Sequence, residues 1–550
     1  MNDVVQPAGQ DEAPAVLQIE GLSVALPKGA DRPLAVENVS YSVNRGEIMC
    51  VVGESGSGKS MAANTVMGLL PKGVRPVQGS VTFEGQNLLA LSEKQHRTLR
   101  GLKIGMIFQE PMTALNPLMR VGAQIAEVFE AHGQLSPRQR QARALELLVE
   151  VGIPQPEKAI SAYPFELSGG QRQRVMIAMA LALEPVLLIA DEPTTALDVT
   201  TQAQILALIR DLQQRRGMAV MFITHDFGVV AEIANRVCVM RHGRIVEIGN
   251  ARDVLENPQD AYTQALIAAI PSNALPPHRA PATSAPLLEI KGLNKVFRSR
   301  GGWFKATREV RALDDVSLTL AKGETVGIVG ESGSGKSTLG RCVVRLEHPD
   351  NGELLLDGVN FSQLNGSALR RERHRVQMIF QDPYASLNPR TRVGMAIAQG
   401  PMANGTPKAD ALRQAGELLE LVGLGASAVT RFPHEFSGGQ RQRIGIARAL
   451  ALNPELIVAD EAVSALDVSI QAQVLELLES LKQRLSLSLL FITHDLRVAA
   501  QICDRIVVMQ HGRIVEQGSA EQIFMAPQAA YTRSLLDAIP GREAPAAASA

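Results

Sequence analysis

The sequence is poor in aromatic residues and in net charge, and each shortage excludes a class of function. Phe, Trp and Tyr make up 4% of the chain, which is too few for a surface that stacks nucleic-acid bases. Lys and Arg number 55 against 56 Asp and Glu, a formal net charge of -1. Without a basic field, sequence-independent binding to phosphate backbones is not favoured. We therefore expect no nucleic-acid partner.

Cysteines and long apolar runs are also scarce. The four cysteines stand far apart, with no paired spacing typical of a zinc ribbon or a disulfide framework, so we expect buried thiols in a reducing compartment. The longest apolar stretches, 176–183 and 186–190, are interrupted by Glu184 and Pro185 and are shorter than the roughly 20 residues that span a bilayer. The first 15 residues include acidic side chains and no basic one, which predicts no secretion signal.

The chain repeats itself once, and this repeat organises everything else. Segments of the first half recur in the second at a constant offset of 269 residues: 167–185 as 436–454, 221–226 as 490–495, and 242–249 as 511–518. The eight residues GESGSGKS occur at 53–60 and again at 330–337. The expected organisation is a disordered N-terminus 1–16, a first domain 17–271, a Pro/Ala-rich linker 272–286, a second domain 287–540 and a disordered tail 541–550.

Within each repeat, strand and helix patterns alternate. EIMCVVG at 47–53 predicts a buried strand that enters a glycine turn, and MAANTVMGLL at 61–70 predicts the helix that follows. VLLIAD at 186–191 and AVMFITHD at 219–226 predict further apolar strands. The alternation predicts an α/β fold with a mostly parallel sheet and with phosphate chemistry at the C-terminal ends of its strands.

Two glycine-rich segments predict phosphate-binding loops. Glycines between a strand and a helix let backbone N–H groups curl around phosphates, and the helix N-terminus faces the negative charge. The predicted nucleotide-binding residues are Gly53, Glu54, Ser55, Gly56, Ser57, Gly58, Lys59 and Ser60, with Gly330, Glu331, Ser332, Gly333, Ser334, Gly335, Lys336 and Ser337 in the second repeat. We expect both lysines to reach the β- and γ-phosphates, and Ser60 and Ser337 to ligate Mg²⁺. The alternative, an ordinary glycine-rich turn, is disfavoured by the second occurrence.

A pair of carboxylates follows a buried strand in each repeat. Asp191 and Glu192 follow one apolar run, and Asp460 and Glu461 follow its counterpart. The aspartate suits the outer sphere of a metal, and the glutamate is placed to polarise an attacking water. Two acids after a strand could merely begin a loop, but beside a phosphate loop the catalytic interpretation is favoured.

A second candidate anion site begins the helix after residue 168. Ser168 is a good N-cap, and the glycines that follow expose N–H groups at the start of a helix that we expect Pro185 to end. The residues concerned are Ser168, Gly169, Gly170 and Gln171, with Ser437, Gly438, Gly439 and Gln440 in the second repeat. A capped helix without a ligand is the alternative.

These segments resemble the ABC ATPase family over about 17–271 and 287–540. Each repeat also carries, in the family's order, a Q-loop glutamine, a D-loop aspartate and an H-loop histidine: Gln109, Asp198 and His225, then Gln381, Asp467 and His494. The resemblance implies that the glutamines and histidines act in catalysis with Glu192 and Glu461. It also implies that Gln109 and Gln381 join Ser60, Ser337, Asp191 and Asp460 around the metal. Alone, His225 would more often be a core histidine and Gln109 a solvated loop residue.

The resemblance implies a complete architecture. We expect two tandem P-loop NTPase domains of the α/β class, each with a mostly parallel sheet core and a helical subdomain that carries the signature motif, with ATP and Mg²⁺ as cofactors. In the family, two such domains dock head to tail, so each ATP lies between the phosphate loop of one domain and the Ser-Gly-Gly turn of the other. Here that pairing would be intramolecular.

Other segments resemble one branch of the family, the oligopeptide/dipeptide importers. They are 110–117 and 382–389 after the Q-loop glutamines and 261–271 and 530–540 near the end of each repeat; the second repeat is most similar to glutathione-import ATPases. This branch implies two transmembrane permease subunits, an extracytoplasmic solute-binding protein, and peripheral attachment through the permeases at the cytoplasmic face of the inner membrane. The alternative is a two-domain ATPase of translation or DNA repair, which the short linker and the absence of zinc-binding cysteines disfavour.

The repeats depart from the family pattern at the adenine contact. Importer ATPases usually stack an aromatic ring on adenine, and Phe297 fits that position in the second repeat, whereas the first has Leu26. We therefore expect weaker stacking in the first site. The cysteine-rich C-terminal segment of some peptide-importer ATPases is missing, so no iron–sulfur cluster is expected.

Overall fold

The computed structural model describes residues 15–195, 197–270, 285–299, 308–464 and 466–540. The chain divides into two compact units: the first comprises Met1–Leu197 and Thr201–Ile270, and the second comprises Pro271–Ala550 together with Asp198–Thr200. The expected N-terminal segment 1–16, the linker 272–286 and the tail 541–550 lie outside the described residues, except for 15, 16, 285 and 286. In the described part of the chain, no helix combines the length and the apolar character needed to cross a membrane.

The first unit contains a six-stranded sheet and a four-stranded antiparallel sheet. The order in the larger sheet is β10 (Arg244–Asn250), β9 (Arg236–Arg241), β3 (Ile48–Val52), β8 (Ala219–Thr224), β7 (Leu187–Asp191) and β6 (Ile104–Ile107). Its neighbours are parallel except for β9 and β10. The smaller sheet has the order β2 (Leu34–Asn44), β1 (Ala15–Ala25), β4 (Arg75–Phe83) and β5 (Gln86–Asn87). The mostly parallel sheet expected from the sequence is confirmed.

The central strand β3 is buried on both faces. Met49 and Val51 belong to a core shared with the antiparallel sheet. Ile48, Cys50 and Val52 belong to a second core, shared with the helical part of the unit. Because both faces are covered, the strand is apolar at every position instead of alternating with polar residues. Its C-terminal end therefore leads a rigid element directly into the glycine loop.

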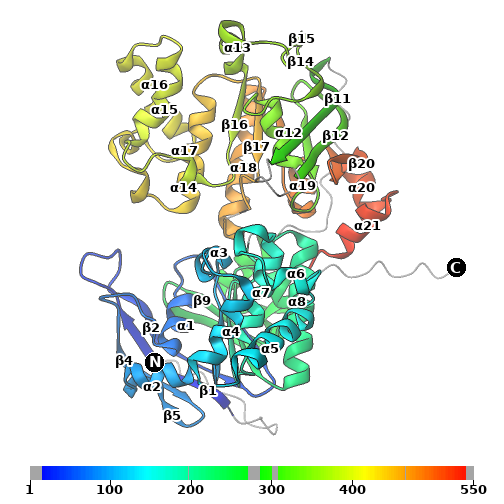
Figure 1. Ribbon diagram of the computed structural model, residues 1–550. Coiled ribbons are helices and arrows are strands. Elements are labelled where there is room, and N and C mark those ends of the chain that lie inside the picture. The colour runs from blue at the N-terminus through cyan, green and yellow to red at the C-terminus, as the bar shows by residue number, and fades with distance from the viewer. Residues whose placement is uncertain (1–14, 196, 271–284, 300–307, 465, 541–550) are drawn as a thin grey trace, which may run out of the picture. The chain divides into compact units, whose positions relative to one another are not determined.

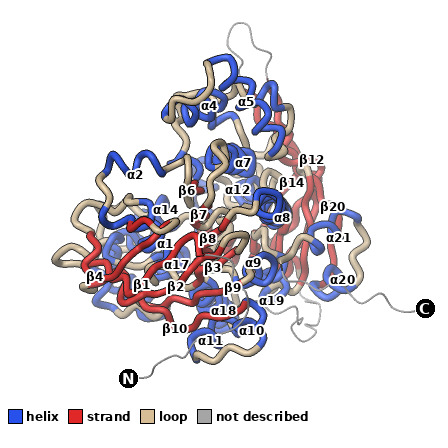
Figure 2. Tube along the Cα trace, turned by 90° about the horizontal axis from the view of Figure 1, so that it is seen from below, coloured by secondary structure: helices blue, strands red, loops and turns tan. Residues whose placement is uncertain are grey.

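The helices of the first unit surround these sheets and form a helical subdomain. They are α1 (Lys59–Met67), α2 (Glu93–Leu99), α3 (Pro111–Ala114), α4 (Val121–Ala131), α5 (Pro137–Glu150), α6 (Pro156–Ala159), α7 (Gly169–Ala180), α8 (Val199–Arg216), α9 (Phe227–Ile233), α10 (Ala251–Glu256) and α11 (Ala261–Ala268), with single 3₁₀ turns at Leu88–Ala90 and Pro164–Glu166. Helices α4, α5 and α7 lie side by side, apart from the antiparallel strands β1, β2 and β4 (Figure 2).

Two helix ends differ from the sequence-based expectation. The helix after the glycine loop stops at Met67 and not at 70, because Gly68 adopts a left-handed C-cap with φ 62°. Helix α7 ends at Ala180, with Leu181 as its C-cap, so the expectation that Pro185 ends it was wrong. A turn at 181–183 separates the helix from the proline, and β7 begins at Leu187.

The second unit repeats this plan. Its six-stranded sheet has the order β16 (Val376–Ile379), β17 (Leu456–Asp460), β18 (Ser488–Ile492), β13 (Thr325–Val329), β19 (Arg505–Gln510) and β20 (Arg513–Ser519), and its four-stranded sheet the order β12 (Arg308–Ala321), β11 (Pro286–Ser299), β14 (Asn351–Leu356) and β15 (Val359–Asn360). Helices α14 to α17 lie on one side of β16 and β17, and β11 and β12 lie on the other (Figure 1).

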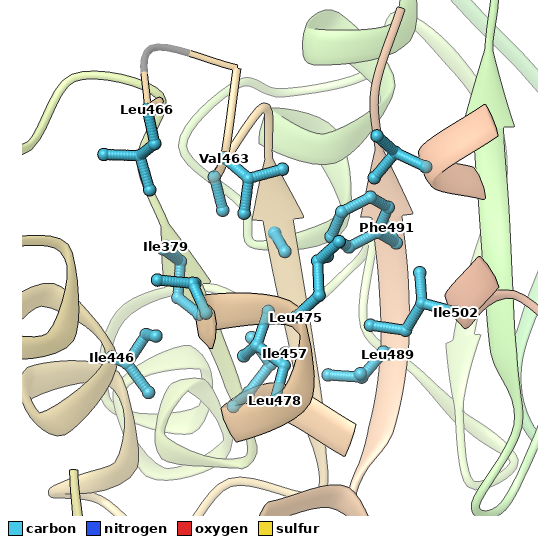
Figure 3. Close-up of a cluster of buried hydrophobic side chains, with 14 of the residues drawn as sticks. Ile379, Ile446, Ile457, Val463, Leu466, Leu475, Leu478, Leu489, Phe491 and Ile502 are labelled. Atoms are coloured by element: carbon cyan, nitrogen blue, oxygen red, sulfur yellow. The ribbon is translucent and has the colours of Figure 1, made fainter. Parts of the chain in front are cut away.

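The α-helices of the second unit match those of the first in order, except that the 3₁₀ turn Ala426–Thr430 stands in the place of α6. They are α12 (Lys336–Val343), α13 (Gly366–Glu372), α14 (Pro383–Ser386), α15 (Val393–Ala403), α16 (Lys408–Leu421), α17 (Gly438–Leu450), α18 (Val468–Leu485), α19 (Leu496–Ile502), α20 (Ala520–Met525) and α21 (Ala530–Asp537), with 3₁₀ turns at Arg373–Arg375, Ala426–Thr430 and Pro433–Glu435. In the core, Ile457 of β17 and Leu489 and Phe491 of β18 lie near Leu475 and Leu478 of α18 (Figure 3). This packing holds the end of β17, where the acidic pair begins.

Candidate functional site

The glycine loop of the first unit joins β3 to α1, and two of its residues have to be glycine. Gly53 has φ 148° and Gly58 has φ 106°, a region that other residues rarely adopt. An added Cβ would lie 2.2 Å from the backbone oxygen of Met240 at Gly53 and 2.7 Å from that of Ala35 at Gly58. The loop therefore packs tightly at the C-terminal ends of β3 and β9 and ends at the N-terminus of α1, where anions are favoured.

The lysine of the loop is buried and folded back onto it. Lys59 Nζ donates to the backbone oxygens of Gly53, at 2.6 Å, and Glu54, at 3.0 Å. The side chain is thus held at the start of α1 by carbonyl groups of the same loop. This places a positive charge within the curl of backbone N–H groups, as phosphate binding requires.

The serine at the end of the loop meets the first carboxylate of the acidic pair. Ser60 Oγ donates to Asp191 Oδ1 at 2.9 Å, which joins the start of α1 to the end of β7. Burial raises the pKa of Asp191 to about 6, although the hydrogen bond from Ser60 opposes that rise. A hydroxyl and a carboxylate held side by side are oxygen ligands of the kind that Mg²⁺ prefers.

The catalytic candidates meet at the second carboxylate of the pair, Glu192. Glu192 Oε2 accepts hydrogen bonds from Gln109 Nε2 at 2.9 Å and from Thr195 Oγ1 at 3.0 Å, and His225 Nδ1 lies 3.4 Å from the same oxygen. Burial alone would raise the pKa of Glu192. The hydrogen bond and charge of His225, with Lys59, outweigh it and lower the pKa to about 2, so this carboxylate stays ionised.

Local backbone geometry sets these side chains in place. Glu192 has φ 46°, a left-handed conformation that costs roughly 1–3 kcal/mol in a residue other than glycine. His225 follows β8 directly, and the next residue, Asp226, caps α9 by accepting from Gly228 N at 2.8 Å. Strand ends and a helix cap, rather than mobile surface side chains, therefore aim Glu192 and His225 at one another.

The second unit has the same arrangement. Lys336 Nζ donates to the backbone oxygens of Gly330 and Glu331 at 2.7 and 2.9 Å, and Ser337 Oγ donates to Asp460 Oδ1 at 2.8 Å.

Its catalytic candidates also meet at one carboxylate oxygen. Gln381 Nε2 donates to Glu461 Oε2 at 2.6 Å, and His494 Nδ1 lies 3.6 Å from that oxygen. Burial raises the pKa of Asp460. Burial would also raise the pKa of Glu461, but the hydrogen bond and charge of His494 outweigh it and lower that pKa. Glu461 has φ 47°, so the backbone strain is repeated as well.

The signature segments form capped helix starts. Ser168 Oγ accepts from Gln171 N at 3.3 Å, and Gln171 Oε1 accepts from Ser168 N at 2.9 Å; Ser437 and Gln440 repeat both bonds. Among the described residues, these hydrogen bonds stay within the cap and do not reach the phosphate loop of the same unit. Both serines are exposed, so the caps are open to a ligand.

The two candidate adenine contacts differ in exposure and surroundings. Phe297, near the end of β11, is 40% exposed, and Lys295 Nζ lies 5.3 Å from its ring centroid. Leu26 follows β1 and is half-buried, with its backbone N–H donating to Pro33 O. Of these two aligned positions, only the one in the second unit therefore carries a flat, exposed ring.

Sequence reasoning missed one contact of each loop. Tyr262, in the first turn of α11, accepts a hydrogen bond on its hydroxyl from Glu54 N at 3.2 Å. Tyr531, in α21, accepts one from Glu331 N at 3.1 Å. The available signal was the repeat of Ala-Tyr-Thr at 261–263 and 530–532, which lies in the segments that resemble the importer branch.

Comparisons with known proteins bear on the family of the chain. A model described as "ABC transporter" matches residues 36–195 and 313–464, and one described as "Oligopeptide/dipeptide transporter, C-terminal region" matches 246–300 and 515–549. The chain is 47% identical over 527 residues to the peptidoglycan transport ATP-binding protein YejF of Agrobacterium fabrum, covering 95% of this chain and 96% of the relative. It is 46% identical over 557 residues to the glutathione import ATP-binding protein GsiA of Pectobacterium atrosepticum, covering 96% and 89%.

A solved structure was also matched, a dimeric ATP-binding cassette in a post-hydrolysis state with ADP and Pi. It is 28% identical, covers 42% of this chain and 98% of its own, and has a TM-score of 0.38. The family models and the two relatives confirm the family and the tandem-domain fold expected from the sequence. With both repeats matched by the family model and relatives nearly half identical along almost the whole chain, the chain belongs to the ABC transporter ATP-binding proteins and carries the oligopeptide/dipeptide C-terminal region twice.

Proposed function

We propose that the chain is the ATP-hydrolysing, energy-coupling subunit of an import system for glutathione or other short peptides. The observation that carries the proposal is the C-terminal region: after each ATP-binding cassette the chain adds a segment that matches the oligopeptide/dipeptide transporter model. The names of the relatives, which concern glutathione and peptidoglycan transport, support a peptide-like cargo.

Each phosphate loop binds the phosphates of one ATP in this proposal. Lys59 and Lys336 supply the positive charge, and the backbone N–H groups of the loops supply the hydrogen bonds. Glu192 and Glu461 orient the attacking water, since both carboxylates are held ionised. Gln109 and His225, with Gln381 and His494 in the second unit, fix those carboxylates through the contacts already described.

The residues at the end of each loop fit Mg²⁺. In the described residues no group of three or more His, Cys, Asp or Glu side chains is arranged to hold a metal. Mg²⁺ in phosphate-transfer sites needs fewer protein ligands, because it is held by one or two protein oxygens together with phosphates and water. Ser60 and Asp191, with Ser337 and Asp460, are the proposed holders, joined by Gln109 and Gln381. When bound, the ion neutralises charge on the phosphates.

We propose further that the two domains, 17–271 and 287–540, pair head to tail. Each ATP would then meet Lys59 of one domain and the Ser437 cap of the other, or Lys336 and the Ser168 cap. Resemblance to the family supports this pairing, and the exposed N–H groups at both caps supply the chemistry that an ATP phosphate needs. Pairing within one chain makes a second ATPase subunit unnecessary.

The proposed partners are two transmembrane permease subunits and an extracytoplasmic solute-binding protein. The chain would attach peripherally through the permeases at the cytoplasmic face of the inner membrane. The experiment that tests this function co-purifies the full chain with its membrane partners and reconstitutes them in liposomes with the binding protein. We expect ATP-dependent uptake of glutathione or a short peptide and a matching rise in ATPase rate. No ATP-dependent uptake by the reconstituted complex, together with ribosome binding by the chain at physiological salt, would contradict it.

A further inference from the structure

Each phosphate loop is held from outside by a tyrosine of the C-terminal region. The Tyr262 hydroxyl accepts from the backbone N–H of Glu54, the second residue of the loop. Lys59 donates to the backbone oxygen of that same residue. Glu54 is therefore fixed on both of its backbone polar groups, by the loop's own lysine on one and by α11 on the other. A change at the tyrosine acts on the residue that also positions the lysine.

The element that carries the tyrosine is itself anchored. Glu247 of β10 accepts hydrogen bonds from the backbone N–H groups of Gln259 and Asp260, at 2.8 and 3.2 Å. Asp260 then caps α11 by accepting from Tyr262 N at 2.8 Å. A continuous series of contacts thus runs from the edge strand of the sheet to the loop. Burial raises the pKa of Tyr262 to about 12, so the hydroxyl keeps its proton at neutral pH.

The second unit repeats the anchor as well as the contact. Glu516 accepts from the N–H groups of Gln528 and Ala529 at 2.7 and 3.0 Å, and the Tyr531 hydroxyl accepts from Glu331 N. Two features are not repeated: Ala529 stands where Asp260 caps α11 and gives α21 no side-chain cap, and the arginine beside the tyrosine ring has no counterpart. Arg241 lies 4.6 Å above the Tyr262 ring, whereas the aligned position 510 is glutamine. The hydroxyl bond to the loop, and not the cation–π contact, is what both units share.

We propose that Tyr262 and Tyr531 are positioning residues through which the C-terminal region of each unit holds the phosphate loop in the conformation that binds ATP. The loop needs such support because all three of its glycines have positive φ, and glycine gains the most conformational freedom when released. The inference rests on the proposed role of the loops in binding ATP. It adds that a region outside the ATP-binding cassette sets how well they bind.

The test is the double variant Tyr262→Phe/Tyr531→Phe in the full chain, which removes the two hydroxyls and keeps the rings. A lost hydrogen bond of ordinary strength predicts a rise of roughly two- to tenfold in the Kd for ATP and in KM. We expect kcat to stay within about twofold, because Glu192 and Glu461 keep their contacts. Tyr41→Phe is the matched control: Tyr41 is buried, and its hydroxyl contacts Met221 Sδ at 3.7 Å, away from the loop.

Fluorescent-nucleotide binding, steady-state kinetics and thermal unfolding separate the outcomes. A rise in Kd and KM in the double variant but not in Tyr41→Phe supports the inference. Unchanged Kd and KM, with or without a lower Tm, would refute it, because the tyrosines would then be merely structural. A fall in kcat with KM unchanged would also refute it. If the wild-type chain bound no ATP, the assignment of the loops would fail, and this inference with it.

Discussion

Replacing both proposed water-orienting carboxylates with amides tests the centre of the catalytic assignment. In Glu192→Gln, the amide oxygen can still accept from Gln109 and Thr195, because it takes the place of the carboxylate oxygen that both now reach. The shape of the site is therefore preserved, and the lost property is the negative charge that the low pKa of Glu192 maintains. Neither Lys59 nor Ser60 makes its described hydrogen bonds to Glu192, so ATP binding should be spared.

The expected loss of rate follows from the proposed role of Glu192 and Glu461 as general bases. Loss of a positioned general base reduces a rate by roughly 10²- to 10⁴-fold, which corresponds to about 2.7–5.4 kcal/mol in the activation free energy at about 1.36 kcal/mol per factor of ten. We expect kcat of the double variant Glu192→Gln/Glu461→Gln to fall by this factor, with the Kd for ATP within about threefold of the wild type, since its contacts lie elsewhere.

Phosphate release by the purified full chain gives kcat, and binding of a fluorescent ATP analogue gives Kd. Glu47→Gln/Glu324→Gln is the control, because both glutamates are buried and lie at the opposite end of β3 and β13 from the loops. Each single variant reports on coupling: half of the activity is expected if the sites turn over independently, and almost none if they must act together. Full activity in the double variant, or an equal loss in the control, would refute the assignment.

Four further outcomes are expected. Lys59→Ala should raise the Kd for ATP by roughly 10- to 150-fold, the equivalent of one hydrogen bond to a charged group, as measured by equilibrium binding; an unchanged Kd would remove the lysine from the site. Gly53→Ala should lower Tm and abolish ATP binding at the first site because its Cβ would meet a backbone oxygen, whereas Gly445→Ala, with no atom within 4 Å of the added Cβ, should leave ATP binding intact. Phe297→Leu should weaken ATP binding several-fold and Leu26→Tyr should tighten it, given about 1–3 kcal/mol for base stacking; no change in either would place the adenine contact elsewhere. Filter binding should detect only weak, salt-labile association with DNA, since the net charge is -1.

The sequence predicted those features that depend on local pattern. Continuous apolar runs such as VLLIAD mark strands that are buried on both faces, and glycine spacing marks the loop because few residues tolerate its backbone. The acidic pair was predicted for the same reason, since it follows such a strand. Family resemblance then supplied the roles of Gln109 and His225, which no spacing rule would have given.

Long-range contacts could not be predicted in the same way. Tyr262 and Glu54 are 208 residues apart, and their hydrogen bond depends on how β10 and α11 pack beside the loop. Similarly, nothing in a glutamate indicates that Glu192 adopts a positive φ, because that conformation is imposed by its neighbours. The helix end at Ala180 was mispredicted because proline marks where a helix cannot continue, not where tertiary packing ends it.

The burial of all four cysteines gives this protein a built-in reporter of local opening. Cys50 lies in β3 and Cys238 in β9 of the first unit, and Cys342 lies in α12 and Cys503 after α19 of the second. Burial raises the pKa of both Cys238 and Cys342 to about 12, so their thiols hardly react while folded. A thiol reagent therefore labels a cysteine only when its surroundings open. Labelling rates resolved by peptide mass would time the opening of each half separately, with Cys50 only three residues from the start of its phosphate loop.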